Sequence, residues 1–322
     1  MRRLVALLMG LAMTLLGLVT IGGPVARATT PGTNGRIVFG ADLGLGFQLY
    51  TIKPNGTGFH QVTNVLGDAF QPDWSPDGLL IAFEHDYELD GEENGRIGIV
   101  NADGSDAHDV TPGGVFAAQP AFTPDGDQLV YECGNCPGGN GIFLMAADGS
   151  DFPGLRLSTN PFLDEGDSDP NISPDGQTVT FVRHKVDAEL QALYAVDIDG
   201  TNERRIAPYT LEVAVKHDWA PDGEHIVIGP WADYPDHQSP NVATIAPDGS
   251  YLRMLTNYTG GEVGAFAGSY SPDGRWIVFR VENLSRDSFR LFKMRPDGSD
   301  RTLIASLPFA PRGSDWGSRP ES

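Results

Sequence analysis

The stretch Trp74-Ser75-Pro76-Asp77-Gly78 decides the fold, because variants of it occur five times along the chain. The other four copies begin at Phe122, Ile172, Trp219 and Tyr270, and the aspartates of successive copies are 48, 50, 47 and 51 residues apart. A repeat of this length with four strand-like runs per unit is typical of a β-propeller. In each copy Pro presets the first corner of a turn and Gly adopts the left-handed conformation that closes a hairpin. The phrase therefore predicts the turn between the first and second strands of a blade.

A second turn motif repeats in step with the first. It is an Asn-Gly or Asp-Gly pair, with glycines at Gly56, Gly104, Gly149, Gly200, Gly249 and Gly298. The additional copy lies in residues 36–63, which supply three strands with no inner strand before them, while residues 312–317 echo residues 72–74. We therefore predict an all-β, six-bladed propeller of four-stranded antiparallel blades. A C-terminal inner strand completes the N-terminal blade and closes the ring without a free edge.

Residues 1–28 have the features of a signal peptide. Arg2 and Arg3 precede an uncharged apolar run over residues 4–21, and Ala26-Arg27-Ala28 fits the cleavage rule. We predict a propeller over residues 29–322 in a secreted or periplasmic bacterial protein, with no membrane insertion after cleavage. An uncleaved anchor is the alternative, since the run is almost long enough to span a bilayer, but the Gly-Gly-Pro break favours cleavage.

The chain is strongly acidic, with a formal net charge of −21. Cleavage would remove three arginines and no acidic residue, which makes the mature charge −24. A field of that sign repels nucleic acid and anionic lipid, so neither is expected as a partner. It is compatible with a basic partner. We assign no cofactor and expect a monomer.

The two cysteines, Cys133 and Cys136, are predicted to form a disulfide, because they are three residues apart in a chain expected in an oxidising compartment. A redox-active pair needs a helix N-terminus to lower a thiol pKa, whereas this pair lies between two strand-like runs. A zinc site would need two further ligands. The sequence therefore favours a structural disulfide that closes one short loop.

The repeat resembles the WD-like β-propeller repeat of the TolB periplasmic protein and its relatives. The resemblance is carried by the aromatic-Ser-Pro-Asp-Gly phrase, by the apolar strand that ends in Phe83 and its equivalents, and by the strand that leads into Asp-Gly. It implies a six-bladed propeller and a role in protein–protein association in the cell envelope. TolB carries an α/β domain before its propeller, and this chain lacks it, so the resemblance covers the propeller only. The chain also lacks the G-x-S-x-G motif of a peptidase.

Candidate binding residues lie on the face opposite the repeated turns. The turns are short and uniform, which indicates a structural role, whereas the loops between second and third strands and the links between blades vary. The candidates are Trp231 and Tyr234 as anchors on the longest loop, then Lys216, His217, His184 and Phe162. Each link carries one aromatic residue, as Phe162 illustrates. These rings either fill gaps between blades or form an apolar rim that holds a peptide or sugar.

Two functions stay open on this evidence. We favour a non-catalytic scaffold that binds an envelope or extracellular protein or peptide, possibly a glycan, through the variable face. The alternative is an extracellular lyase or hydrolase that acts on a glycan at the channel mouth. It would use histidines expected on the same face, namely His85, His184, His217 and His237. We assign no catalytic residue and no metal site.

Overall fold

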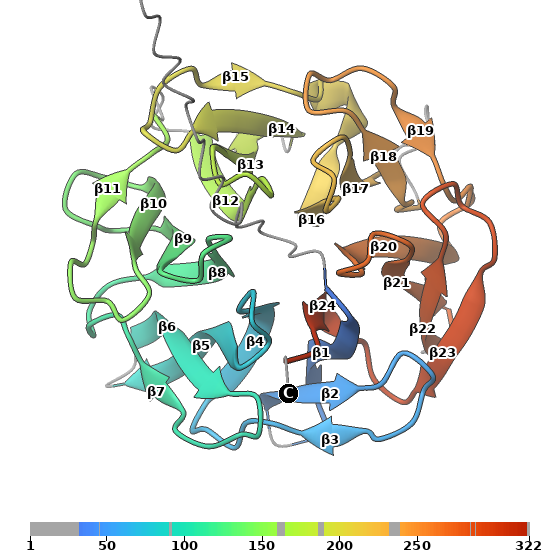
Figure 1. Cartoon of the computed structure of the whole chain (residues 1–322), viewed down its shortest axis with the longest axis horizontal. Helices are drawn as coiled ribbons and strands as arrows, with labels where there is room; N and C mark the ends of the chain where they lie inside the picture. The colour runs from blue at the N-terminus through green and yellow to red at the C-terminus, as the bar shows by residue number, and fades with distance from the viewer. Residues whose placement is uncertain are drawn as a thin grey trace, which may run out of the picture.

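A computed structural model of the chain describes residues 32–44, 46–89, 92–159, 165–185, 190–231, 239–283, 285–286 and 288–320. In these residues 24 strands form six four-stranded antiparallel sheets arranged as a ring (Figure 1). The link before the fifth blade contains a short 3₁₀ turn, η2 (Tyr209–Leu211). The predicted six-bladed propeller is therefore confirmed. No helix in the described ranges is long and apolar enough to cross a bilayer.

We number the blades in chain order and give the strands of each from the axis outward. Blade 1 consists of β24 (Arg312–Ser318), β1 (Asn34–Asp42), β2 (Phe47–Ile52) and β3 (His60–Gln61); blade 2 consists of β4 (Asp68–Trp74), β5 (Leu80–Leu89), β6 (Glu92–Asn101) and β7 (His108–Asp109). Blade 3 consists of β8 (Ala117–Phe122), β9 (Gln128–Cys133), β10 (Gly141–Ala146) and β11 (Leu155–Arg156); blade 4 consists of β12 (Glu165–Ile172), β13 (Thr178–Lys185), β14 (Leu190–Asp197) and β15 (Arg204–Arg205). Blade 5 consists of β16 (Val213–Trp219), β17 (Ile226–Pro230), β18 (Ala243–Ile245) and β19 (Arg253–Met254); blade 6 consists of β20 (Val263–Tyr270), β21 (Ile277–Asn283), β22 (Ser288–Met294) and β23 (Thr302–Leu307).

The seam of the ring is blade 1, where the two ends of the described chain meet. Strand β24 pairs antiparallel with β1, with Trp316 opposite Ile37 and Ser318 opposite Asn34. The Trp316 indole is buried, and its backbone N–H donates to the Ser269 hydroxyl at 2.7 Å. The predicted closure of the N-terminal blade by a C-terminal inner strand is thus confirmed.

The repeated turns form by the chemistry that the sequence predicts. In blade 2 the Ser75 hydroxyl lies 2.6 Å from the Asp77 carboxylate and accepts a hydrogen bond from the Leu80 N–H at 2.8 Å. Gly78 has φ of +70°, the left-handed region that favours glycine. These turns and the Asp-Gly turns between third and fourth strands share one side of the ring, which we call the turn face. The other side, with the loops between second and third strands and the interblade links, we call the loop face.

The core consists of apolar layers between neighbouring blades. One layer packs Val38 and Leu49 of blade 1 against Trp74, Ile81 and Phe83 of blade 2, all of them buried. Because both faces of the middle strands contact a neighbouring blade, their sequences are continuous apolar runs. Packing between blades therefore supports the inner strands in fixed positions around the axis.

The predicted disulfide between Cys133 and Cys136 is present at the end of β9. Its loop is also tied to the link that enters blade 3. The Gly134 N–H donates to the Phe116 carbonyl at 2.9 Å, and the Phe116 N–H donates to the Asn135 side chain at 2.7 Å. The disulfide thus fixes the shape of part of the loop face.

Candidate functional site at the ring axis

Polar side chains near the ends of the inner strands connect each blade to the next. The position immediately before the aromatic residue of the turn phrase holds an Asp in three blades. Its carboxylate accepts the backbone N–H of the equivalent aromatic residue in the following blade: Asp315 from Trp74 at 2.9 Å, Asp73 from Phe122 at 2.9 Å and Asp218 from Tyr270 at 2.7 Å. These carboxylates enclose the turn-face end of the axis, where a cavity of about 40 Å³ has room for a few water molecules.

A β-bulge changes the direction of the inner strands three residues before the aromatic residue of the turn phrase. Gln71, Gln119, Asp169 and Lys216 have φ of 48°, 51°, 49° and 73° there, which is uncommon for residues other than glycine. The backbone N–H of Lys216 donates to the Asp169 carboxylate of the preceding blade. The bulges therefore hold charged side chains close to the axis, where sequence alone would not place them.

The predicted pair Lys216 and His217 is separated by this bulge. The Lys216 ammonium interacts with the carboxylates around the axis. His217 is buried between blades 4 and 5, where Nε2 lies 2.8 Å from the Thr180 hydroxyl and Nδ1 lies 3.2 Å from Asp169. Its ring therefore has structural partners on both nitrogens.

Lys216 acts as an internal counter-ion for the axial acids. Burial alone would lower the pKa of Lys216, but the carboxylates of Asp315, Asp73, Asp169 and Asp218 raise it, so the ammonium stays charged. Burial, together with the charge of Asp315, raises the pKa of Asp218 to about 7. Burial also raises the pKa of Asp73 well above its usual range. One lysine thus compensates only part of the axial negative charge.

Three further acids gather with Asp169 towards the loop face, at the boundaries between blades 2, 3 and 4. We call Glu84, Glu132, Asp167 and Asp169 the acidic cluster. Burial, with the charges of Asp169 and Asp167, raises the pKa of Glu132 to about 8. Burial and neighbouring acids raise the pKa of Glu84 as well. The Glu132 side chain is partly exposed, and no described residue donates a hydrogen bond to its carboxylate.

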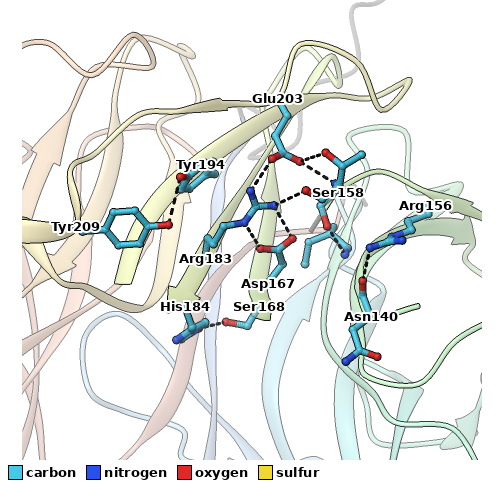
Figure 2. A network of polar contacts seen from close by, with 12 residues as sticks. Asn140, Arg156, Ser158, Asp167, Ser168, Arg183, His184, Tyr194, Glu203 and Tyr209 are labelled. Carbon is cyan, nitrogen blue, oxygen red and sulfur yellow. Dashed lines mark hydrogen bonds and ion pairs between the residues drawn. The ribbon is translucent and has the colours of Figure 1, made fainter. Parts of the chain in front are cut away.

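One member of the cluster is fully paired, as Figure 2 shows. Arg183 on β13 binds Asp167 with two nitrogens, Nε at 2.6 Å and Nη2 at 2.8 Å, and Glu203 with Nη1 at 2.6 Å. Its guanidinium also lies over the Tyr194 ring, 4.6 Å from the centroid. Hydrogen bonds to Asp167 and Glu203 raise the pKa of Arg183 although burial opposes this. The network holds blade 4 together and leaves Glu132 as the open carboxyl of the cluster.

The remaining predicted site residues are distributed around the loop face. His184 is half-buried and lies 2.5 Å from the Ser168 hydroxyl (Figure 2). Trp231 follows β17 and packs edge-on against Phe266, with the ring centroids 6.4 Å apart. Phe162 and Tyr234 lie outside the described residues, as does His237. His85 contacts Asp109 at 2.7 Å in blade 2, so His85, His184 and His217 each have a separate partner.

Sequence analysis missed the acidic cluster and the axial acids, although both leave a signal. Glu84 and Glu132 each follow the aromatic residue that ends an apolar strand, and they are 48 residues apart, one repeat. The axial aspartates each precede the aromatic residue of the turn phrase. Aligning the repeats by position, rather than searching for clustered histidines, would have found both sets.

The raised pKa of Glu132 predicts a pH-dependent stability. Because the folded pKa exceeds the unfolded value of 4.5, the folded state holds the proton more strongly, and wild-type stability should fall as pH rises from about 4.5 to 8. Glu132→Gln mimics the protonated form. We expect it to raise the free energy of unfolding at pH 9 by about 1–3 kcal/mol, with little change at pH 5. Urea denaturation at both pH values measures this; Glu224→Gln, on the turn face, is the control, and parallel curves for wild type and Glu132→Gln would contradict it.

The fold and this axis define a six-bladed propeller with a charged centre. The chain belongs to the family of the TolB beta propeller domain, whose sequence model matches residues 22–215. The TolB resemblance predicted from the repeat is thus confirmed.

Three individual proteins are similar to this chain. The uncharacterized protein Atu1656 of Agrobacterium fabrum is 26% identical over 197 residues, which is 61% of this chain and 59% of that protein, so the chain spans less than two thirds of its length. The crystal structure of TolB from Acinetobacter baumannii has a TM-score of 0.68 at 19% identity and matches 88% of this chain and 67% of its own. An oligogalacturonate lyase in complex with manganese has a TM-score of 0.53 at 13% identity, over 86% and 75% of the two chains. At these identities the solved structures establish a shared fold.

Proposed function

We propose that the protein is a secreted or periplasmic, non-catalytic scaffold that binds a cationic segment of an envelope or extracellular protein or peptide at the loop face. The observation that carries this proposal is the acidic cluster around the open carboxyl of Glu132. Acids gathered with too few counter-charges raise the energy of the unliganded state, and a basic partner lowers it. Membership of the TolB family supports a binding role over catalysis.

The pKa of Glu132 sets how this binding should respond to conditions. A cationic partner prefers the ionised carboxylate, so affinity should increase as the pH rises through about 8. Added salt should weaken binding, because it screens the partly exposed charges. A neutral glycan would show neither dependence, which separates the two kinds of partner.

The test is affinity capture from the envelope and secreted fractions of the native host, followed by titration of the captured partner. We expect Glu84→Gln/Glu132→Gln to weaken its affinity about tenfold or more, as removal of charged contacts at an interface does. The matched control is Asp106→Asn/Glu224→Gln, which removes the same charge from exposed positions outside the cluster. Equal affinity of wild type and the cluster variant would refute the proposed site, and equal loss in both variants would reduce it to a long-range charge effect.

Trp231 is the proposed anchor elsewhere on the loop face, where blades 5 and 6 meet. Its ring is half-buried against Phe266, and Arg280 lies over the other ring of the pair, 4.1 Å from the Phe266 centroid. Trp231→Ala in the same titration separates an aromatic contact from a charge contact, because its effect should not depend on salt. The glycan-acting alternative would need converging ligands, whereas His85, His184 and His217 each have a separate hydrogen-bond partner.

A further inference from the structure

Another pocket lies on the turn face at the seam, away from the acidic cluster. Its volume is about 680 Å³, within the range of small-molecule sites. Arg36 and Lys53 come from blade 1, Trp74 from blade 2, Lys293 from blade 6 and Arg319 from the segment after β24. We call it the seam pocket. It is complete only when the ring has closed.

The charge of the seam pocket is opposite to that of the molecule. The chain has 43 acidic and 22 basic residues, yet four basic and no acidic residues line this pocket. None of the four cations forms an ion pair with a carboxylate of the described residues. Like charges held together repel one another, and a bound anion would relieve that repulsion.

Two of the cations are held in place by neutral hydrogen-bond acceptors. Arg36 donates from Nε to the Thr51 hydroxyl at 2.8 Å and from Nη2 to the Gly58 carbonyl. Lys293 donates to the Pro54 carbonyl at 3.2 Å. These contacts are with neutral groups, so they orient the cations without neutralising them. Lys53, which is exposed, can move towards a ligand.

A buried donor in the pocket wall also lacks a partner. Trp74 is 8% exposed, and its indole N–H has no hydrogen-bond acceptor in the described ranges. The equivalent Trp219 donates to the Thr180 hydroxyl at 3.0 Å, but blade 1 has Val38 at the position of Thr180. An unpaired buried N–H is costly and uncommon in native structures. The indole N–H of Trp316, which does not line this pocket, lacks a partner as well, so the Trp74 ring contributes an apolar wall to the pocket rather than a donor.

We propose that the seam pocket binds a small organic anion. Its carboxylate or phosphate groups pair with Lys53, Lys293 and Arg319, and its apolar side lies against Pro54 and Trp74. Carboxylate and phosphate share the charge and acceptor geometry that such cations recognise. Because three blades and the C-terminal segment contribute, the bound anion holds the ring closed and stabilises the folded state.

The test is calorimetric titration of the full-length protein with citrate, glucuronate and glucose 6-phosphate at constant ionic strength, with neutral glucose as the uncharged probe. We expect at least one anion to bind, and Lys53→Gln/Lys293→Gln to weaken its affinity about tenfold or more. Selective binding of the phosphate or of the carboxylates identifies the ligand class, and either result supports the site. Arg204→Gln/Arg205→Gln, which removes the same charge from exposed positions in blade 4, should retain affinity.

Three results would overturn the proposal. The first is that no anion binds the wild type. The second is that glucose binds as well as the anions, and the third is that the lysine variant keeps wild-type affinity. A variant truncated after Pro320 tests whether the chain's own C-terminal residues occupy the pocket. If this variant binds an anion that the full chain does not, the pocket is occupied by residues 321–322 of the chain itself rather than by a separate ligand.

Discussion

Deletion of residues 312–322 is expected to abolish stable folding at 25 °C. The deletion removes β24, and with it the buried Trp316 and the hydrogen bond that the Asp315 carboxylate accepts from the Trp74 N–H. Loss of one large buried aromatic side chain alone costs about 3–5 kcal/mol, against a total stability of about 5–15 kcal/mol for a typical domain. Circular dichroism melting of the truncated chain measures the loss.

Two variants make this result specific to the seam. Deletion of residues 319–322 leaves β24 in place and, among the described residues, removes the hydrogen bond from the Arg319 N–H to the Thr33 carbonyl, so it should melt close to wild type. A permuted chain, in which residues 312–318 precede Asn34 through a Pro-Asp-Gly linker, uses the turn of the other blades and should recover stability. An unchanged melting temperature after the full deletion would contradict the assignment of β24 as the inner strand.

Asp167→Asn is expected to lower the free energy of unfolding by about 3 kcal/mol, because it leaves the buried Arg183 guanidinium with only one carboxylate partner. The Asp167 and Arg183 side chains are 0% and 4% exposed. In contrast, Asp197→Asn breaks a bond of 3.3 Å to Arg204 on the surface and should cost less than about 1 kcal/mol. Urea denaturation compares the two pairs within one blade, and equal losses would show that burial does not decide the effect.

The fold could be predicted from the sequence because its signals are local. Turns such as the one at Gly78 depend on a few adjacent residues, so their chemistry is readable and their spacing counts the blades. The seam could be predicted by counting strands, since the N-terminal blade lacked an inner strand and the C-terminal segment supplied it. Packing between blades needed only the continuous apolar runs.

The candidate site was harder to predict because it depends on contacts between repeats. Lys216 and His217 are adjacent in sequence, and nothing local shows that a bulge with φ of 73° separates their environments. Burial raises the pKa of Glu132 most, and acids of the next blade, more than 30 residues away, raise it further. The candidates Phe162 and Tyr234 lie outside the described residues, so their roles stay predictions.

Closure through β24 also sets the earliest moment at which this protein can become native. During synthesis the three outer strands of blade 1 emerge first, and their inner partner follows only at residue 312. Until then the edge of β1 has no neighbour and the growing chain must be kept from pairing with other strands. A blade that cannot be completed before residues 312–318 are made keeps the ring open for most of the time that the chain is being synthesised.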